Sequence, residues 1–239
     1  KDEDIMINYT PFGHSDWQNI VSDIKRFGSA GKKTAVVSTI NGDANVPFYR
    51  ELGNQGITSE NIPVIAFSVG EEELSGIDTK PLVGHLAAWN YFMSEENEAN
   101  EAFIKTWHSF IKDKKRVTND PMEAHYIGFN MWVKAVEKAG TTDVDKVIDA
   151  MVGVEVPNLT GGTSKMLPNH HITKPVLIGE IQDDGQFLTV WQTEGLVEGD
   201  AWSDFLEGSK DLTADWTKPI SCGNYNTKTK TCLGAAAAQ

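Results

Sequence analysis

The chain has 239 residues, of which 40% are hydrophobic and 23% are charged, and its formal net charge is -13. This length allows one large domain or two small ones, and no apolar run is long enough to cross a bilayer. The strong negative charge disfavours nucleic acids and anionic membrane surfaces as partners.

The first part of the chain alternates between strand and helix patterns. Residues 5–10 are apolar and predict a short strand, and a helical pattern then runs from Trp17 to Gly28. The segment Lys33–Tyr49 follows, with a β-branched run that breaks at Asn41-Gly42-Asp43 and a helical pattern that opens at Asn45. We interpret it as a buried parallel strand, a tight turn and a helix.

The same unit repeats twice more. Ile62–Ser68 and Val83–Trp89 are further apolar strands, and the first of them runs into a glycine turn with three acids. Strands and helices that alternate at this spacing predict βαβ units and a parallel sheet.

The ends of these strands carry the candidate site. In an open α/β sheet, ligands bind at the carboxyl ends of the strands, and neighbouring parallel strands bring these ends together. For the three acids after the second strand, a solvated helical turn and a carboxylate facing a cleft both remain open. The candidate ligand contacts are Ser38, Thr39, Asn41, Asp43, Ser68, Glu71, Glu72, Trp89 and Tyr91.

From residue 97 the pattern changes to helices without intervening strands. Helices are predicted at 98–112, from Asn119-Asp120-Pro121 to Gly140, and at 142–152, and their wide apolar faces require a sheet to cover. Two strands at 174–182 and 186–193 flank Asp183-Asp184-Gly185, which is a strong hairpin signal. Beyond Gly195 we predict an extended arm.

The two cysteines, Cys222 and Cys232, lie in a polar segment near the C-terminus. A short disulfide loop is the preferred interpretation and would imply an oxidising compartment, and two unpaired thiols are the alternative. The absence of a CxxC pattern or a nearby histidine argues against a zinc or redox site.

No catalytic or cofactor-binding motif is present in the sequence. His170-His171 could form a metal or acid/base pair, but a structural loop pair is the simpler interpretation because no carboxylate or cysteine stands at ligand spacing. The strand-end residues include hydroxyl, amide, carboxylate and aromatic groups but no arginine or lysine. A small neutral or cationic polar solute therefore fits this site better than an anion.

Five runs in the chain carry a closer likeness. They are STINGDANVPFYREL, NQGITSENIPVIAFSVGEEEL, DTKPLVGHLAAWNYF, RVTNDPMEAHYIG and NHHITKPVLIGEIQDDGQF. In this order and spacing the chain resembles, from Thr10 to Thr231, the substrate-binding protein of bacterial ABC-type urea importers. That family belongs to the branched-chain amino acid and amide group of type I periplasmic binding proteins.

The resemblance implies an α/β fold of two lobes that close on a ligand by hinge motion. In this chain it implies a parallel sheet flanked by helices with a C-terminal antiparallel meander. The family's first-lobe sheet and signal peptide would precede Lys1, so that sheet is expected to be missing from this chain. The implied divisions are the second-lobe sheet at 1–92, first-lobe helices at 93–155, the meander returning to the second lobe at 156–195, and an arm with a disulfide loop at 196–239.

The resemblance further implies a periplasmic receptor, without enzymatic activity or cofactor, that captures urea or a short amide for the permease of an ABC importer. The Cys222–Cys232 tail also resembles that of urea-binding members. In this interpretation Asp43 and one acid of Glu71–Glu72 accept urea N–H groups, and Trp89 and Tyr91 form walls. The urea carbonyl would meet Ser38, Thr39, Asn41 or Ser68.

Three alternatives remain open at this point. One is an amide-sensing regulator of the same fold, and another is a branched-chain amino acid binding protein. The third is an amidohydrolase that would use His170-His171 and an acid.

Overall fold

The computed structural model describes residues 4–200, 205, 225–226 and 231–232. The chain separates into two compact units, Lys1–Gly199 and Asp200–Gln239. The division at 92, 155 and 195 that the resemblance implies stays a prediction.

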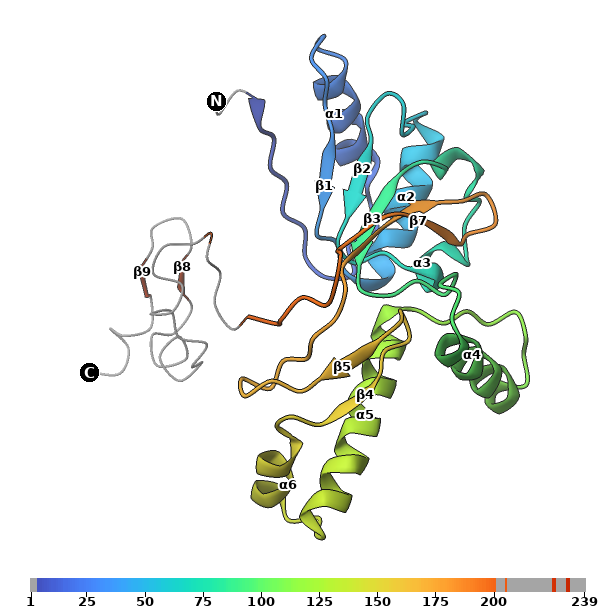
Figure 1. Ribbon diagram of the computed structural model, residues 1–239. Coiled ribbons are helices and arrows are strands. Elements are labelled where there is room, and N and C mark those ends of the chain that lie inside the picture. The colour runs from blue at the N-terminus through green and yellow to red at the C-terminus, as the bar shows by residue number, and fades with distance from the viewer. Residues whose placement is uncertain (1–3, 201–204, 206–224, 227–230, 233–239) are drawn as a thin grey trace. The chain divides into compact units, whose positions relative to one another are not determined.

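A mixed five-stranded sheet forms the centre of the first unit (Figure 1). Its strand order is β1-β2-β3-β6-β7, in which the first three strands are parallel and the last two are antiparallel. The β6–β7 hairpin turns at Gly185, whose φ of 79° explains the glycine of the predicted turn. The strands are β1 (Val36–Ser38), β2 (Val64–Ala66), β3 (Leu86–Trp89), β6 (Leu177–Ile181) and β7 (Phe187–Gln192).

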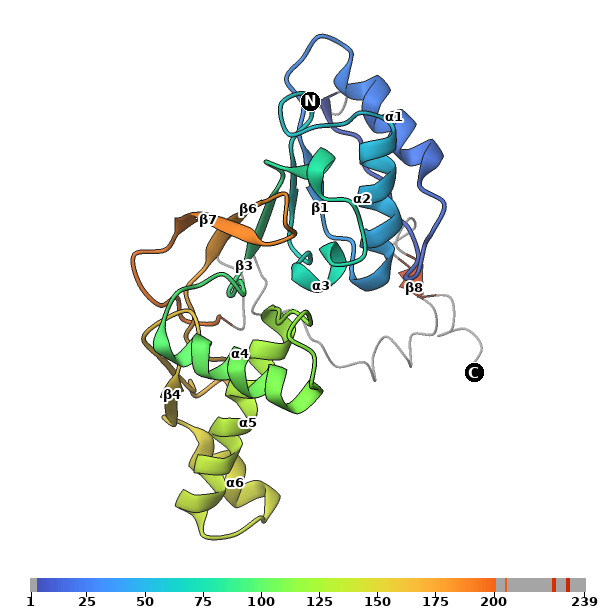
Figure 2. The ribbon, with the colours of Figure 1, turned by 90° about the vertical axis from the view of Figure 1, so that its right-hand side faces the viewer.

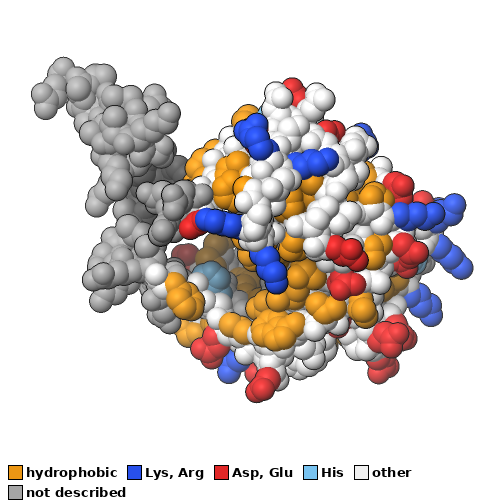
Figure 3. All heavy atoms as spheres, turned by 90° about the horizontal axis from the view of Figure 1, so that it is seen from above, with side chains coloured by type: hydrophobic (Ala, Val, Ile, Leu, Met, Phe, Trp, Pro, Cys, Tyr) orange, Lys and Arg blue, Asp and Glu red, His pale blue; other side chains and the backbone are white. Residues whose placement is uncertain are grey.

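Helices α1 (Gln18–Gly28) and α2 (Asn45–Asn54) lie on the same side of this sheet (Figure 2). They bury a core that includes Trp17, Phe48 and Leu177. On the other side of the sheet, hydrophobic residues such as Val37 and Leu188 are exposed. Figure 3 shows hydrophobic side chains open to solvent on the face seen from above. The short elements are η2 (Gly42–Ala44), α3 (Glu71–Leu74) and η3 (Lys80–Leu82).

The predicted strand at residues 5–10 is wrong. This segment is not part of the sheet, and Ile7 and Tyr9 are 68% and 95% exposed. A strand is defined by its pairing, and the hydrogen bonds of β1 are made with β2. The apolar composition of residues 5–10 was therefore not sufficient to predict a strand.

The middle of the chain is helical, as predicted. Asn119 caps α5 by accepting from the Met122 N–H at 3.2 Å, and Gly140, with a φ of 65°, ends the helix. α5 and α6 pack with a small hairpin, β4 (Glu155–Pro157) and β5 (Thr163–Lys165), around Met131. The sequence analysis predicted no strand at either side of this hairpin. The helices are α4 (Glu98–Ile111), α5 (Asp120–Ala139) and α6 (Val144–Met151).

Among the described residues of the second unit, β8 (Tyr225–Asn226) and β9 (Thr231–Cys232) form an antiparallel pair. The predicted disulfide lies outside the described residues, because Cys222 and the side chain of Cys232 are not among them.

Candidate ligand-binding site

The carboxyl ends of β1 and β2 are joined directly. The Ser68 hydroxyl donates to Asn41 Oδ1 at 2.7 Å, so two predicted contacts from different strands touch each other. Beneath them the buried Asn45 amide donates to three backbone carbonyls, those of Ile40 at 2.9 Å, Gly42 at 3.2 Å and Ser68 at 3.2 Å. Asn45 therefore fixes the two strand ends relative to each other. The sequence suggested it only as the first residue of a helix.

The predicted contacts after β1 differ in accessibility. Ser38 is buried, and its hydroxyl accepts from the Ile40 N–H at 3.4 Å. Thr39, Asn41 and Asp43 are exposed. A ligand at this edge can therefore reach a hydroxyl, an amide and a carboxylate.

The end of β3 reaches the same region through Trp89. This side chain is partly buried, and a methyl group added at Gly70 would lie 3.5 Å from its ring and 3.5 Å from Cβ of Asn119. The ends of β2 and β3 and the start of α5 therefore converge at Gly70. Asn119, at the start of α5, is a neighbour that the sequence did not connect with the site.

Tyr91 is fully buried, which corrects its predicted position as a wall of the site. Its hydroxyl hydrogen bonds to Asn100 Oδ1 at 2.7 Å and to Thr118 Oγ1 at 2.8 Å, and its ring packs with Phe103 and Leu159. The chain leaves the sheet after Trp89, so the alternation of the strand no longer determines which way Tyr91 points.

The three acids at the start of α3 have three different environments. Glu71 is fully buried, and its Oε1 accepts from the Met93 N–H at 2.6 Å, so its predicted contact with a ligand does not fit this placement. Glu72 is exposed and pairs with Arg116 at 3.3 Å. Glu73 caps the helix by accepting from the Gly70 N–H at 2.9 Å.

A buried polar cluster, which the sequence did not predict, lies next to these ends. Asp120 accepts from the Asn90 N–H at 3.0 Å, and Glu123 forms an ion pair with Lys174. The Asn90 side chain also donates to the Pro175 carbonyl at 2.6 Å, which ties the segment after β3 to the segment before β6. Two acids three residues apart in the first turn of a helix were a possible signal, because they share one helix face.

Burial dominates the electrostatics of these carboxyl groups. Desolvation raises the pKa of Glu71 to about 8, although the hydrogen bond from Met93 opposes it. Desolvation also raises the pKa of Glu123 to about 7, despite the opposing charge of Lys174, and it raises the pKa of Asp120. Glu71 is therefore largely protonated at neutral pH.

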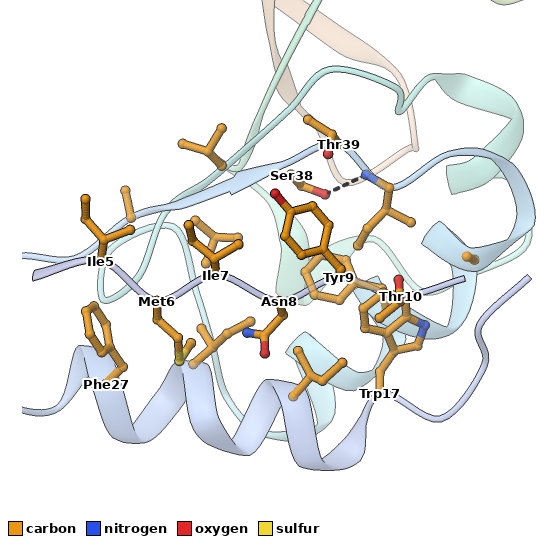
Figure 4. A pocket seen from close by; sticks show the side chains of 18 of the residues that line it. Ile5, Met6, Ile7, Asn8, Tyr9, Thr10, Trp17, Phe27, Ser38 and Thr39 are labelled. Carbon is orange, nitrogen blue, oxygen red and sulfur yellow. Dashed lines mark hydrogen bonds between the residues drawn. The ribbon is translucent and has the colours of Figure 1, made fainter. Parts of the chain in front are cut away.

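A hollow of about 580 Å³ extends along β1 (Figure 4). Residues 4–12 form one side of it, and α1 and β1 form the others. Ser38, Thr39 and Asn41 contribute to its lining, which is otherwise largely apolar. The hollow follows the length of β1, whereas the joined strand ends lie only at one end of it.

The structure offers no metal centre among the residues it describes, since no three histidine, cysteine or acidic side chains are grouped for a metal ion. His170 and His171 are both exposed. The geometry therefore adds nothing in favour of the histidine-based hydrolase.

Comparison with known proteins identifies the family to which the chain is related. A model described as "Periplasmic binding protein domain" matches residues 1–208. A Leu/Ile/Val-binding protein homolog of Brucella melitensis is 24% identical over 182 residues, which are 74% of this chain and 45% of that protein. A limonene hydroxylase of Geobacillus stearothermophilus is 29% identical over 121 residues, 48% of this chain and 21% of that protein.

The fold also resembles solved structures. A solute-binding protein of an ABC transporter from Rhodopseudomonas palustris, in complex with p-hydroxybenzoic acid, superimposes with a TM-score of 0.67 at 21% identity. The likeness covers 79% of this chain and 51% of that protein. The chain thus spans about half the length or less of the relatives it matches.

Proposed function

The chain belongs to the periplasmic binding protein domain family, and from this premise we propose that it is the ligand-binding part of a receptor that captures urea or a short amide. Its fold is the type I periplasmic binding protein fold, with a mixed sheet flanked by helices, as the sequence predicted. The ligand binds at the ends of β1, β2 and β3 and is released unchanged.

The observation that carries this proposal is the contact between Asn41 and Ser68, because it joins polar groups from two strand ends at one place. Urea is small, planar and uncharged, with four N–H donors and one carbonyl acceptor. The exposed Asp43 carboxylate accepts N–H groups, and the Thr39 hydroxyl donates to the carbonyl, because the single proton of the Ser68 hydroxyl is already donated to Asn41. Trp89 provides a flat apolar surface beside them.

The charges near the strand ends support a neutral ligand. Carboxylate ligands are usually held by arginine or lysine, and the strand-end residues include neither. Two cations that contact the acids of this region are engaged, Arg116 with Glu72 and Lys174 with Glu123. A carboxylate ligand would therefore have no unengaged cation among these residues.

A second candidate ligand is a branched-chain amino acid, which the Leu/Ile/Val-binding homolog supports. The ammonium group of such a ligand would pair with Asp43. Its carboxylate would depend on backbone N–H groups and hydroxyls alone, which makes this the weaker candidate.

The proposed partner is the permease of an ABC-type importer, and the proposed location is the periplasm. The solute-binding protein that the fold resembles belongs to an ABC transporter, which supports the partner, and the match to a periplasmic binding protein domain supports the location. No helix in the described part of the chain has the length and apolarity needed to cross a membrane.

Calorimetric titration tests the ligand class. Urea, acetamide, leucine and 4-hydroxybenzoate are titrated separately into the protein at neutral pH. Saturable heat with urea or acetamide, and none with the two carboxylates, supports the proposal. Saturable heat with leucine or 4-hydroxybenzoate alone, or with none of the four, contradicts it.

A further inference from the structure

Glu71 is a buried acid that lies directly after the β2 end of the candidate site and binds the backbone of another segment. It is the first residue of α3 and follows the β2 end, Ser68–Gly70, without a break. Its side chain is fully buried, with Oε1 accepting from the Met93 N–H at 2.6 Å. Oε2 is buried and has no hydrogen-bond partner in the described structure.

Met93, whose N–H is bound by Glu71, also contacts two other segments of the chain. Met93 lies in the connector between β3 and α4, and its carbonyl accepts from the Asn100 side chain at 3.1 Å. Its sulfur accepts from the Thr118 N–H at 3.4 Å. Helix α3, helix α4 and the segment before α5 therefore all contact one residue of this connector.

Packing alone does not explain an acid at this position. A buried polar atom without a partner costs free energy, so a methionine or leucine would fill the same volume with less penalty. The side-chain oxygen provides one thing that an apolar side chain cannot, which is an acceptor for the Met93 N–H. Without it that N–H would lose its partner.

We propose that Glu71 is a positioning residue that holds the ligand-contacting end of β2 against the connector between β3 and α4. This inference rests on the proposed function, since it assigns to Glu71 the orientation of Ser68 and Gly70 towards the ligand. Because Glu71 and Gly70 are adjacent, any shift of Met93 is transmitted directly to the β2 end.

The hydrogen bond between the Met93 N–H and Glu71 should also depend on pH. The acidic groups whose charges raise the pKa of Glu71 are Glu73 on its own helix and Asp120 on α5. Glu123 lies in the same cluster as Asp120 and is paired with Lys174. Glu72 faces solvent with Arg116. Since burial beside two other acids raises the pKa of Glu71 to about 8, the buried position favours the protonated acid, and this preference is lost as the pH rises from about 5 through about 8. The buried position of Glu71 is then disfavoured and its hold on Met93 is weakened.

Hydrogen exchange at the Met93 amide tests the contact without any ligand. The measurement compares the wild type with Glu71→Gln, which keeps an acceptor but does not ionise, and Glu71→Met, which fills the volume without an acceptor. Glu72→Gln is the matched control on the exposed side of the same helix. Exchange rates are divided by the intrinsic rate at each pH, and a far-ultraviolet circular dichroism spectrum verifies that each variant is folded.

We expect wild-type protection at Met93 to fall about tenfold between pH 7 and pH 9, since the protonated fraction falls by that factor across a pKa of 8. Glu71→Gln stays protected at both pH values, Glu71→Met is unprotected at both, and Glu72→Gln behaves as the wild type. Equal protection in the wild type and Glu71→Met, or the same pH-dependent loss in Glu71→Gln, would overturn the proposal.

A urea titration at pH 7 tests the consequence for binding. Glu71→Met weakens binding about tenfold or more, and Glu71→Gln restores it, if the residue positions the β2 end. Equal affinities in all variants, with Met93 unprotected in Glu71→Met, would also overturn the proposal. If the wild type does not bind urea, the proposed function fails, and the exchange experiment still decides whether Glu71 holds the connector.

Discussion

Lys174 and Glu123 form a buried ion pair that links α5 to the segment leading into β6. The two residues are 51 positions apart in the sequence, and neither side chain is more than 10% exposed. The backbone of Lys174 is also fixed, since its N–H donates to the Val197 carbonyl at 3.1 Å and its carbonyl accepts from the Val197 N–H at 2.8 Å. The pair therefore holds the helical part of the unit next to the sheet.

Replacement of Lys174 by alanine should be strongly destabilising. It leaves Glu123 buried without its cation, which typically costs about 3–5 kcal/mol. Lys165 provides a control, because it lies 4.0 Å from Glu155 in a pair that is more than half exposed. Lys165→Ala should change the free energy of unfolding by less than about 1 kcal/mol. Guanidinium unfolding measures both, and equal effects would contradict a structural role for the buried pair.

Stability should fall as the pH rises from about 5 to about 8. The pKa of Glu71 and of Glu123 is raised in the folded protein, to about 8 and about 7, so the folded state keeps protons that the unfolded chain releases. The stabilisation is complete below the unfolded pKa and is lost as the pH rises through the folded value, with a slope of up to about 1.4 kcal/mol per pH unit for each proton. Glu71→Gln should reduce this slope, as measured by guanidinium unfolding at several pH values. An unchanged slope would show that Glu71 is not the titrating group.

His85 should make the stability of the fold depend on pH in the acid range, where stability falls as the pH is lowered. It is buried, its Nδ1 accepts from the Val64 N–H at 3.0 Å, and desolvation lowers its pKa to about 4. Its contribution to stability is present above the unfolded pKa and is lost as the pH falls from about 6.5 towards 4. His85→Gln should remove this part of the acid-induced loss. The same replacement at the exposed His125 should leave the acid profile unchanged, and equal effects of the two would contradict the assignment.

Asn45→Ala should loosen the joined ends of β1 and β2. It removes the side-chain amide to which three partly buried carbonyls are hydrogen-bonded, and the loss of these bonds should cost about 1–3 kcal/mol. Asn54→Ala, at the exposed end of the same helix, should change stability by less than about 0.5 kcal/mol. Hydrogen exchange at residues 40–42 should accelerate only in the first variant. Unchanged exchange there would show that Asn45 does not hold these ends together.

The sequence predicted the sheet well because its strands are strongly patterned. The β-branched runs around Val36 and Val64 and the Asp183-Asp184-Gly185 turn each specify one local structure. The β4–β5 hairpin was missed because its strands, such as Thr163–Lys165, are short and mostly polar. Residues 5–10 show the opposite case, since an apolar run forms a strand only where a neighbouring strand accepts it.

The meeting of the strand ends could be predicted from the sequence, but the placement of the individual candidate residues could not. The rule that ligands bind at strand ends correctly brought Asn41 and Ser68 together. It could not orient Glu71 or Tyr91, because both follow the end of a strand, where side chains no longer alternate between two faces. The Lys174–Glu123 pair depends on a tertiary contact across 51 positions, which no local pattern encodes.

The most direct test of the central claim is a nuclear magnetic resonance titration of the isotopically labelled protein with urea at millimolar concentration. If the strand ends bind the ligand, the backbone amide signals of Thr39, Asn41 and Gly70 shift saturably, and Asp43→Asn weakens the effect while Asp149→Asn, on the exposed side of α6, does not. Saturable shifts confined to the part of the hollow away from the strand ends, at Ile7, Tyr9 and Val37, or no saturable shift anywhere, would contradict the account.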